Sequence, residues 1–220
     1  DQDDQHEYDG DHLILPFGGG GALLQKLAAG LDIRMRCTVR AIHHDDGGVK
    51  LDTSAGVLKA DAVVCTLPLG VLQLAPEDGG VLFSPPLPDA KQQALERLGY
   101  GILNKVALFF DTAFWKHDTD FFGRVVPSPK QRGKYFLFFN LHAASGQPVL
   151  LALAAGAAAA ELELLDDESV TQQAVAALRS MFGERNVPEP LRTMVTRWGG
   201  DKFARGSYSY VAVGGSGRDY

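Results

Sequence analysis

The chain has 220 residues, of which 45% are hydrophobic, as expected for a folded globular protein with one large or two small domains. Its formal net charge of -6 argues against general nucleic-acid binding, and no apolar run is long enough to span a membrane. Cysteine and histidine spacings predict neither a disulfide framework nor a metal site.

Six of the first dozen residues are acidic (Asp1, Asp3, Asp4, Glu7, Asp9 and Asp11), and they form either a solvated segment or a rim that attracts a cationic substrate. The glycine run at residues 18–21 departs from the GxGxxG phosphate-binding pattern, because Leu23 occupies the third small position. We therefore expect it to lead into a helix that ends at Gly30.

Residues 31–66 have the pattern of β-strands. We expect strands at residues 31–33, 37–42, 49–51 and 57–58, with a hairpin turn at 45–48. Residues 62–66 form an apolar run of the kind that is buried on both faces of a sheet, and the turn at 67–70 ends it. The amides of such a turn lie where α/β folds bind cofactors.

The remainder alternates between helices and strands. A proline-rich extended segment at residues 83–88 precedes a helix that Asp89 caps and Gly99 ends. Asp166 or Asp167 caps a later helix at residues 169–182, and another helix covers 157–165. The strands that we expect are at residues 102–110, 121–126, 135–140, 149–154, 191–198 and 207–213.

One charged residue interrupts the apolar strand at residues 102–110. With a side-chain period of two, Lys105 shares a face with Leu103, Ala107 and Phe109. A buried, unpaired ammonium is costly, so Lys105 either snorkels to water from a strand end or is a functional lysine in a dry cavity.

Five segments of the sequence together resemble the flavin-dependent amine oxidases, and most closely the lysine-specific histone demethylases. Polyamine oxidases share the strand motifs, so the family is better supported than the subfamily. The matching segments are residues 32–40, 65–72, 83–87, 98–106 (with Asn104-Lys105-Val106) and 196–210 (with Thr196-Arg197-Trp198).

The resemblance implies the central part of a two-domain, FAD-binding amine oxidase fold of the α/β (α+β) class. Residues 1–101 would belong to the FAD-binding domain and residues 102–220 to a mixed-sheet substrate domain. The family's dinucleotide fingerprint, its second flavin motif and the helical tower that holds a corepressor are not in the sequence. We therefore interpret the chain as an excerpt that alone is inactive and does not retain FAD, from a nuclear protein with no membrane contact and no direct nucleic-acid contact in this segment.

The resemblance also implies a set of site residues. Lys105 is the catalytic residue and holds a water against the flavin, while aromatic side chains and an acidic, histone-facing rim line the substrate path. Phe139 and Phe203 occupy positions that are often tryptophan in the family. The implied FAD contacts are Val39, Thr66, Leu67, Pro68, Trp198, Phe203 and Tyr208, and the implied substrate contacts are Asp1, Asp3, Asp4, His12, Phe139 and Tyr208.

Each of these residues also has a plainer interpretation as sheet packing, core aromatics or a solvated edge. The function implied by the resemblance is oxidation of mono- or dimethyllysine in a basic histone tail, with release of formaldehyde and hydrogen peroxide. The alternatives are a polyamine oxidase and a catalytically silent amine-oxidase-like module that binds a protein or peptide.

Overall fold

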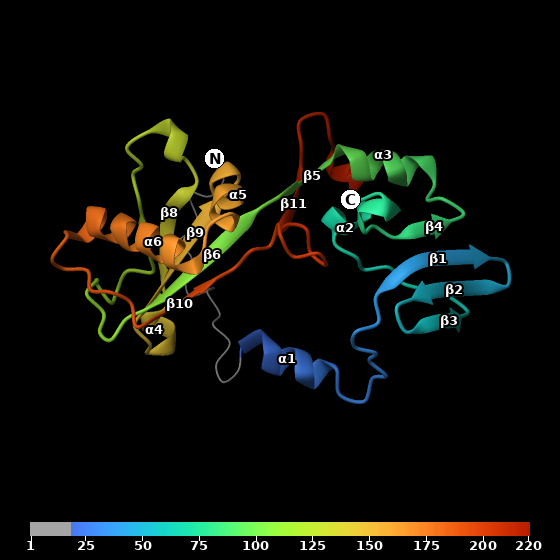
Figure 1. The fold of residues 1–220 in the computed structure, drawn as a ribbon, viewed down its shortest axis with the longest axis horizontal. Coiled ribbons are helices and arrows are strands. Elements are labelled where there is room, and N and C mark those ends of the chain that lie inside the picture. Colours follow the sequence, from blue (N-terminus) through green and yellow to red (C-terminus); the bar gives the residue numbers. More distant parts are fainter. Residues whose placement is uncertain (1–18) are drawn as a thin grey trace.

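The computed structural model describes residues 19–220, except for the side chain of Ala143. It consists of two lobes that lie side by side in Figure 1. One nearly continuous run of chain passes between them: β5 (Leu98–Gly101) belongs to the first lobe, and β6 (Leu103–Phe109) is a strand of the second lobe's sheet. Only Ile102 separates the two strands.

The first lobe contains a four-stranded sheet in the order β3-β2-β1-β4, in which β1 and β4 are parallel and the other pairs are antiparallel. The predicted hairpin turn is confirmed, and Asp45 stabilises it by accepting a hydrogen bond from the Gly47 amide at 2.8 Å. The elements of the first lobe are β1 (Val39–Asp45), β2 (Gly48–Thr53), β3 (Gly56–Ala60), β4 (Leu82–Ser84), α2 (Leu69–Leu72) and α3 (Asp89–Arg97). The predicted helix near the N-terminus is α1 (Gly19–Leu27), which stands apart from both lobes in Figure 1.

Four local predictions in this part of the chain are wrong: the strand at residues 31–33, the Asp89 cap, the end of its helix at Gly99, which lies in β5, and the buried strand at residues 62–66. Residues 31–33 are irregular, and Asp89 is the first residue of α3 without capping it through its side chain. Residues 62–66 have no regular secondary structure and are exposed, with Val64 at 87% exposure, and they pair with no strand of the described part. An apolar run becomes a buried strand only where neighbours complete its hydrogen bonds, and the sheet ends at β3 and β4 without reaching it.

The second lobe contains a five-stranded sheet in the order β10-β6-β9-β8-β7, and all its described pairings are antiparallel, so the predicted mixed sheet is wrong. The Asp166 cap is confirmed, since its carboxylate accepts a hydrogen bond from the Ser169 amide at 2.7 Å, and Gly183 follows the last turn of that helix. The strands are β7 (Phe121–Gly123), β8 (Lys134–Asn140), β9 (Val149–Ala155) and β10 (Arg192–Val195), and the helices are α4 (His142–Ser145), α5 (Ala157–Glu163) and α6 (Asp167–Phe182).

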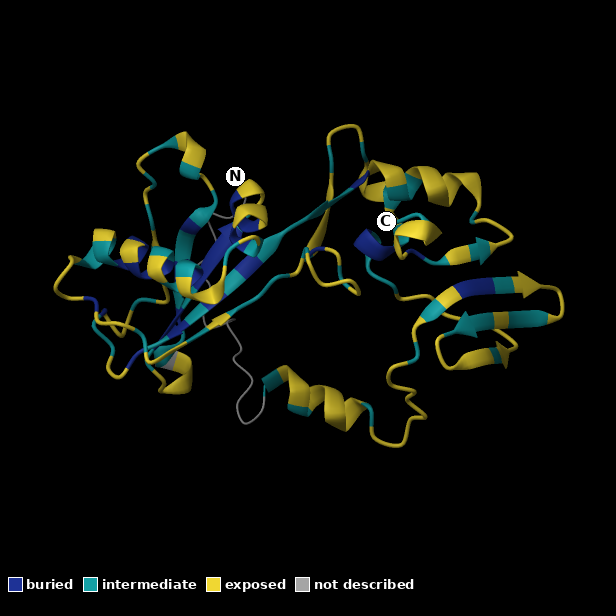
Figure 2. Ribbon diagram, in the orientation of Figure 1, coloured by how far each residue is buried: buried dark blue, intermediate teal, exposed yellow. Residues whose placement is uncertain are grey.

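The main hydrophobic core lies between this sheet and helices α5 and α6. Dark blue, buried residues are concentrated in this lobe in Figure 2. The alternation of β6 places Val106 and Leu108 at full burial on the helix-covered face, next to Phe138 and Leu150 of β8 and β9. On the opposite face, the side chains of β6 are only half-buried, and Lys105 lies there with Leu103, Ala107 and Phe109, as predicted.

The strand β11 (Tyr208–Val211) pairs antiparallel with β5 and completes the connection between the lobes. The ring of Tyr100 fits between Gly70 and Gly206, where an added Cβ would lie 2.6 and 2.5 Å from its carbons, so both positions require glycine. Burial here raises the pKa of Tyr100. Within residues 19–220, no helix combines the length and apolarity that a membrane crossing needs, and no three metal-ligating side chains form a cluster.

Candidate functional site

A cavity of about 800 Å³ lies beside the first lobe's sheet and brings together three of the predicted cofactor contacts. Val39 begins β1, Leu67 lies in the turn before α2, and Phe203 comes from the segment that precedes β11. These residues are far apart in the sequence, and the fold gathers them around one space. Thr66 and Pro68 flank Leu67 but are not among the lining residues.

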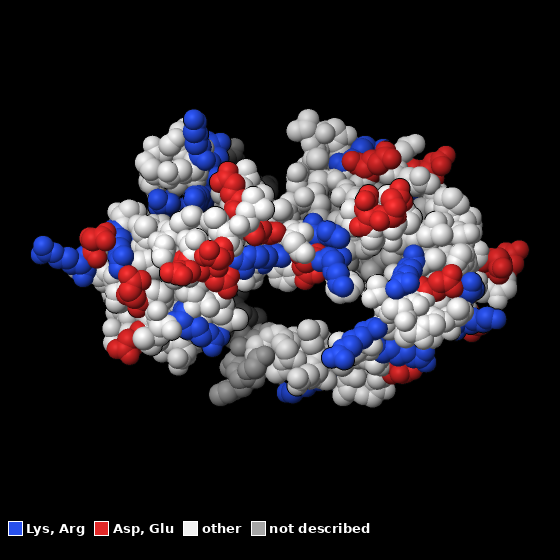
Figure 3. Space-filling view, in the orientation of Figure 1, with Lys and Arg blue, Asp and Glu red and all other residues white. Residues whose placement is uncertain are grey.

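The lining of this cavity is apolar with a strongly cationic border. It contains five cationic side chains and no aspartate or glutamate. Blue Lys and Arg side chains line the opening between the lobes in Figure 3. Such a lining suits an elongated ligand with apolar rings and an anionic centre. The cationic residues are Arg34, Arg36, Arg40, Lys202 and Arg205.

The backbone around the cavity is strained at two non-glycine residues. Arg36 and Arg205 have φ angles of 56° and 59°, in the left-handed region that is costly for side chains with a Cβ. The turn that carries Phe203 is ordered by Asp201, whose carboxylate accepts a hydrogen bond from the Phe203 amide at 2.8 Å. Strain that the fold maintains at a cavity is typical of ligand-binding sites.

Lys105 lies in a different part of the molecule, on the open face of the second lobe's sheet. Its neighbours across the strands are Leu153 of β9 and, beyond it, Leu137 of β8. Phe139 lies in the next row of the same face, paired with Leu151, and its ring centroid is 6.3 Å from that of Phe121. The half-buried Lys105 ammonium therefore belongs to a face that is otherwise largely apolar.

Trp198 and Tyr208, the predicted aromatic walls, come from the two segments that bond to the chain around the start of β6. The Thr196 amide donates to the Lys105 carbonyl at 3.0 Å, so Trp198 follows two residues after the partner of Lys105. Tyr208 pairs with Gly101, which immediately precedes Ile102 and β6. The Trp198 side chain is 40% exposed, and Tyr208 is also exposed.

The predicted residues thus fall into two groups. Val39, Leu67 and Phe203 line the cationic cavity, whereas Lys105 and Phe139 share the open sheet face of the other lobe. Asp1, Asp3, Asp4 and His12, predicted to form the acidic rim, lie outside the described residues.

Two polar residues that were not among the predicted site residues are central to the geometry of this region. Asn104 is fully buried, and its amide donates a hydrogen bond to the Glu163 carboxylate at 2.7 Å. Asn104 is the one polar residue on the buried face of β6, and an asparagine within an apolar strand is the signal that could have revealed it. Glu163 gives no such signal, since it occupies an ordinary helix position.

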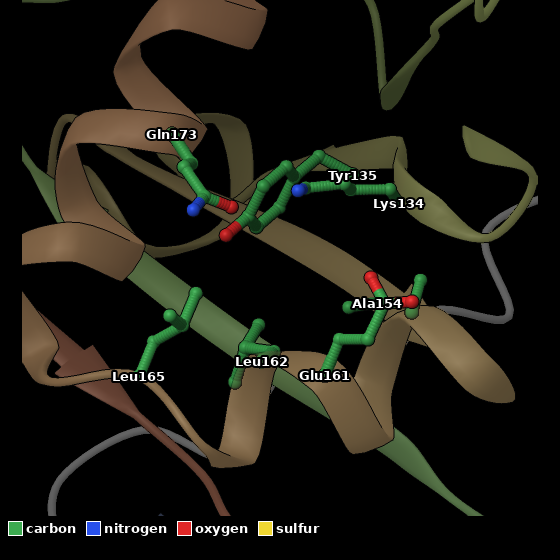
Figure 4. Close-up of a pocket in the computed structure, with 8 residues that line it drawn as sticks. Lys134, Tyr135, Ala154, Glu161, Leu162, Leu165 and Gln173 are labelled. Carbon is green, nitrogen blue, oxygen red and sulfur yellow. The ribbon is translucent and has the colours of Figure 1, made fainter. Parts of the chain in front are cut away.

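A second, smaller cavity of about 200 Å³ lies between β8, α5 and α6, and none of the predicted site residues lines it. Figure 4 shows Tyr135 and Gln173 pointing into it. Tyr135 has a φ of 47°, its hydroxyl donates to the Val170 carbonyl at 3.3 Å, and burial raises its pKa to about 12.

A family model described as flavin-containing amine oxidoreductase matches residues 1–220, the entire chain. The chain belongs to this family. The resemblance drawn from the sequence motifs is therefore confirmed, as is the predicted α/β (α+β) class of an amine oxidase fold.

Over the full length of this chain, this amine oxidoreductase is 44% identical to the Arabidopsis thaliana protein FLOWERING LOCUS D. It is 42% identical to lysine-specific histone demethylase 1 homolog 2 of Oryza sativa subsp. japonica, and 44% identical to possible lysine-specific histone demethylase 1 of Drosophila melanogaster. The whole chain aligns in each comparison, but it spans only 28%, 29% and 26% of these relatives, respectively.

Solved structures support the same fold. Putrescine oxidase, described in its wild-type form as bound to putrescine, superimposes with a TM-score of 0.69 at 20% identity. The superposition covers 89% of this chain and 42% of putrescine oxidase. At that identity the likeness establishes the shared fold of this amine oxidoreductase, and its substrate must be argued separately.

Proposed function

We propose that this chain is the central part of an FAD-dependent amine oxidase that demethylates mono- and dimethyllysine in histone tails. The observation that carries the proposal is the identity of 42–44%, over the entire chain, with proteins named as lysine-specific histone demethylases. Residues 1–101 then contribute to FAD binding and residues 102–220 to substrate binding. A nuclear location and a corepressor bound to another part of the protein belong to the same proposal.

The cationic cavity fits FAD by its chemistry. A dinucleotide combines aromatic rings with an anionic pyrophosphate, and the cavity combines Val39, Leu67 and Phe203 with five cationic side chains. Arginine pairs well with phosphate oxygens because its planar guanidinium donates two parallel hydrogen bonds. Val39 and Leu67 would contact the rings, and the arginines would neutralise the pyrophosphate.

The reaction removes a hydride from the N-methyl carbon of the substrate, and bound FAD supplies the acceptor, which dioxygen regenerates with release of hydrogen peroxide. Lys105 would donate a hydrogen bond from its ammonium to a water and hold that water on the open sheet face. The water adds to the substrate imine, the C–N bond breaks, and formaldehyde leaves the unmodified lysine. Trimethyllysine is excluded because its nitrogen has no lone pair to form the imine.

The aromatic residues supply recognition of the cationic methylammonium group. Trp198, Tyr208 and Phe139 present π-faces, and each such contact stabilises a cation by about 0.5–2 kcal/mol. The predicted substrate contacts near the N-terminus would form an acidic rim that attracts the basic histone tail. They are Asp1, Asp3, Asp4 and His12.

The first experiment is Lys105→Ala in the full-length protein, with Lys59→Ala as a control that removes an exposed strand lysine in the first lobe. We expect Lys105→Ala to remain folded and yellow but to demethylate a dimethyllysine histone peptide at least about 100-fold more slowly. Lys59→Ala should match the wild type. Near-normal turnover of Lys105→Ala would refute the catalytic assignment.

The same assay separates the alternatives. A wild-type protein that oxidises spermidine but not the histone peptide is a polyamine oxidase. A wild-type protein that purifies without flavin absorbance and oxidises neither amine is a binding module.

A further inference from the structure

A buried amide–carboxylate pair connects strand β6 to the segment that follows β10. The Asn104 amide donates to Glu163 Oε1 at 2.7 Å. Its carbonyl oxygen, Oδ1, accepts two hydrogen bonds, from Thr196 Oγ1 and from the Trp198 backbone amide, each at 3.0 Å. All hydrogen-bonding groups of this buried side chain therefore contact the segment 196–198 or the carboxylate that supports it.

Glu163 extends this network to the next two residues. It is the last residue of α5, and its Oε1 accepts a hydrogen bond from the Gly199 amide at 2.8 Å, while its Oε2 accepts one from the Gly200 amide at 2.7 Å. One carboxylate thus binds three donors from two distant parts of the chain. Hydrogen bonds to an ionised acceptor are roughly twice as strong as neutral ones.

Arg197, the residue before Trp198, is also held by side-chain contacts. The Arg197 guanidinium donates to the Leu165 carbonyl at 2.7 Å and forms an ion pair with Asp167 at 2.7 Å. Both partners lie in the corner between α5 and α6. The backbone on each side of Trp198 is therefore held by the helices, while the Trp198 side chain stays 40% exposed.

This arrangement has a direct relation to Lys105. Asn104 and Lys105 are adjacent in β6, so their side chains point to opposite faces of the sheet. The same strand that presents Lys105 on the open face also holds, through Asn104, the backbone of Trp198. The hydrogen bond from the Trp198 amide to Asn104 Oδ1 and one peptide unit of β6 thus connect Trp198 to Lys105.

We infer that Glu163 is a positioning residue that, together with Asn104, fixes the Trp198–Gly199–Gly200 backbone and so sets where the Trp198 ring stands relative to Lys105. The functional part of this inference rests on the proposed amine oxidase function, in which Trp198 walls the amine site. Glu163 itself contacts neither substrate nor cofactor in this role.

The first test measures how firmly Glu163 and Asn104 hold the 198–200 backbone, without any substrate. In the full-length protein, Glu163→Gln keeps the side-chain shape and one acceptor oxygen but places an NH₂ group where the Gly200 amide needs an acceptor. We expect hydrogen–deuterium exchange of the 198–201 amides to become at least about tenfold faster. Glu161→Gln, an exposed change two residues earlier on α5, should leave this exchange unchanged. Unchanged exchange in Glu163→Gln would overturn the inference.

The second test is a double-mutant cycle with Trp198→Ala, measured as kcat/KM on the dimethyllysine peptide. If Glu163 acts through Trp198, Glu163→Gln should lower kcat/KM about tenfold in the wild type and less than about twofold in the Trp198→Ala background. Equal losses in both backgrounds would show that Glu163 supports only general stability, and the positioning role would be rejected.

The two proposals can fail separately. If the wild type oxidises a polyamine and not the peptide, the proposed demethylase function fails, and the cycle is measured with that polyamine. Faster exchange together with a non-additive cycle then still supports the positioning role, whereas multiplicative losses still reject it.

Discussion

Two adjacent glycines beside Glu163 allow a matched test of the packing around Trp198. A Cβ added at Gly199 would lie 2.8 Å from Glu163 Oε2 and 2.9 Å from the terminal carbon of Ile102. A Cβ added at Gly200 would lie 3.5 Å from Glu163 Oε2, which is ordinary van der Waals contact. The same Gly→Ala change is therefore a steric overlap at one position and harmless at the next.

The magnitude follows from how firmly Glu163 is held. Since its carboxylate accepts three hydrogen bonds, it cannot move away from Gly199→Ala without weakening them. Overpacking costs about 1–3 kcal/mol and a weakened charge-assisted hydrogen bond about 1.5 kcal/mol, so we expect a destabilisation of about 2.5–4.5 kcal/mol. Gly200→Ala should be neutral or stabilise the protein by about 0.5 kcal/mol, because alanine restricts the unfolded chain.

The assay is thermal unfolding of the full-length variants, accompanied by hydrogen exchange of the segment around Trp198. Gly199→Ala should lower Tm by several degrees and accelerate local exchange, while Gly200→Ala should do neither. Equal Tm values for the two variants would refute the view that Glu163 is rigidly held against this turn.

Two further changes test other parts of the structure. Burial that raises the pKa of Tyr135 to about 12 gives stability that is fully present below pH 10 and lost as the pH rises toward 12, amounting to about 2–3 kcal/mol. At neutral pH, Tyr135→Phe should lower the unfolding free energy by only about 1 kcal/mol, through loss of the hydrogen bond to Val170. At alkaline pH, the variant should show a flatter fall in Tm than the wild type. The exposed Tyr220→Phe is the control, and an alkaline fall in Tyr135→Phe as steep as in this control would contradict the prediction. Leu108→Ala, at a fully buried core position, should lower the unfolding free energy by about 2–5 kcal/mol in denaturant titrations, while Leu164→Ala, 87% exposed, should change it by less than about 0.5 kcal/mol.

The sequence predicted the second lobe well because its signals are local. Strand alternation placed Lys105 on the correct face, and the capping aspartate at Asp166 marked the start of the long helix. Residues 62–66 show the limit of this reasoning. An apolar run reports that a segment is suited to a buried strand, but the partners that would bury it are specified elsewhere in the chain.

The site was predictable only in part, for the same reason. Lys105 could be found because a charge interrupts an apolar pattern, and Val39, Leu67 and Phe203 because they match family motifs. The bond between Asn104 and Glu163 joins residues 59 positions apart, and Glu163 differs in no way from a solvated helix glutamate in the sequence. Neither the left-handed backbone of Arg36 nor that of Arg205 has a residue-type signature, since both are arginines where glycine would be expected.

The crossing from β5 to β6 has a consequence for engineering this protein by recombination. Ser207 binds both the amide and the carbonyl of Leu103, at 3.0 and 3.1 Å, just where the chain leaves one lobe for the other. A chimera that grafts the second half of one homologue onto the first half of another must therefore preserve the residue count of this crossing and also inherit its serine from the same parent. A junction between residues 103 and 207 would take the two partners from different homologues, whereas a junction at Ile102 would keep them in one parent and would instead separate β5 from its partner strand β11.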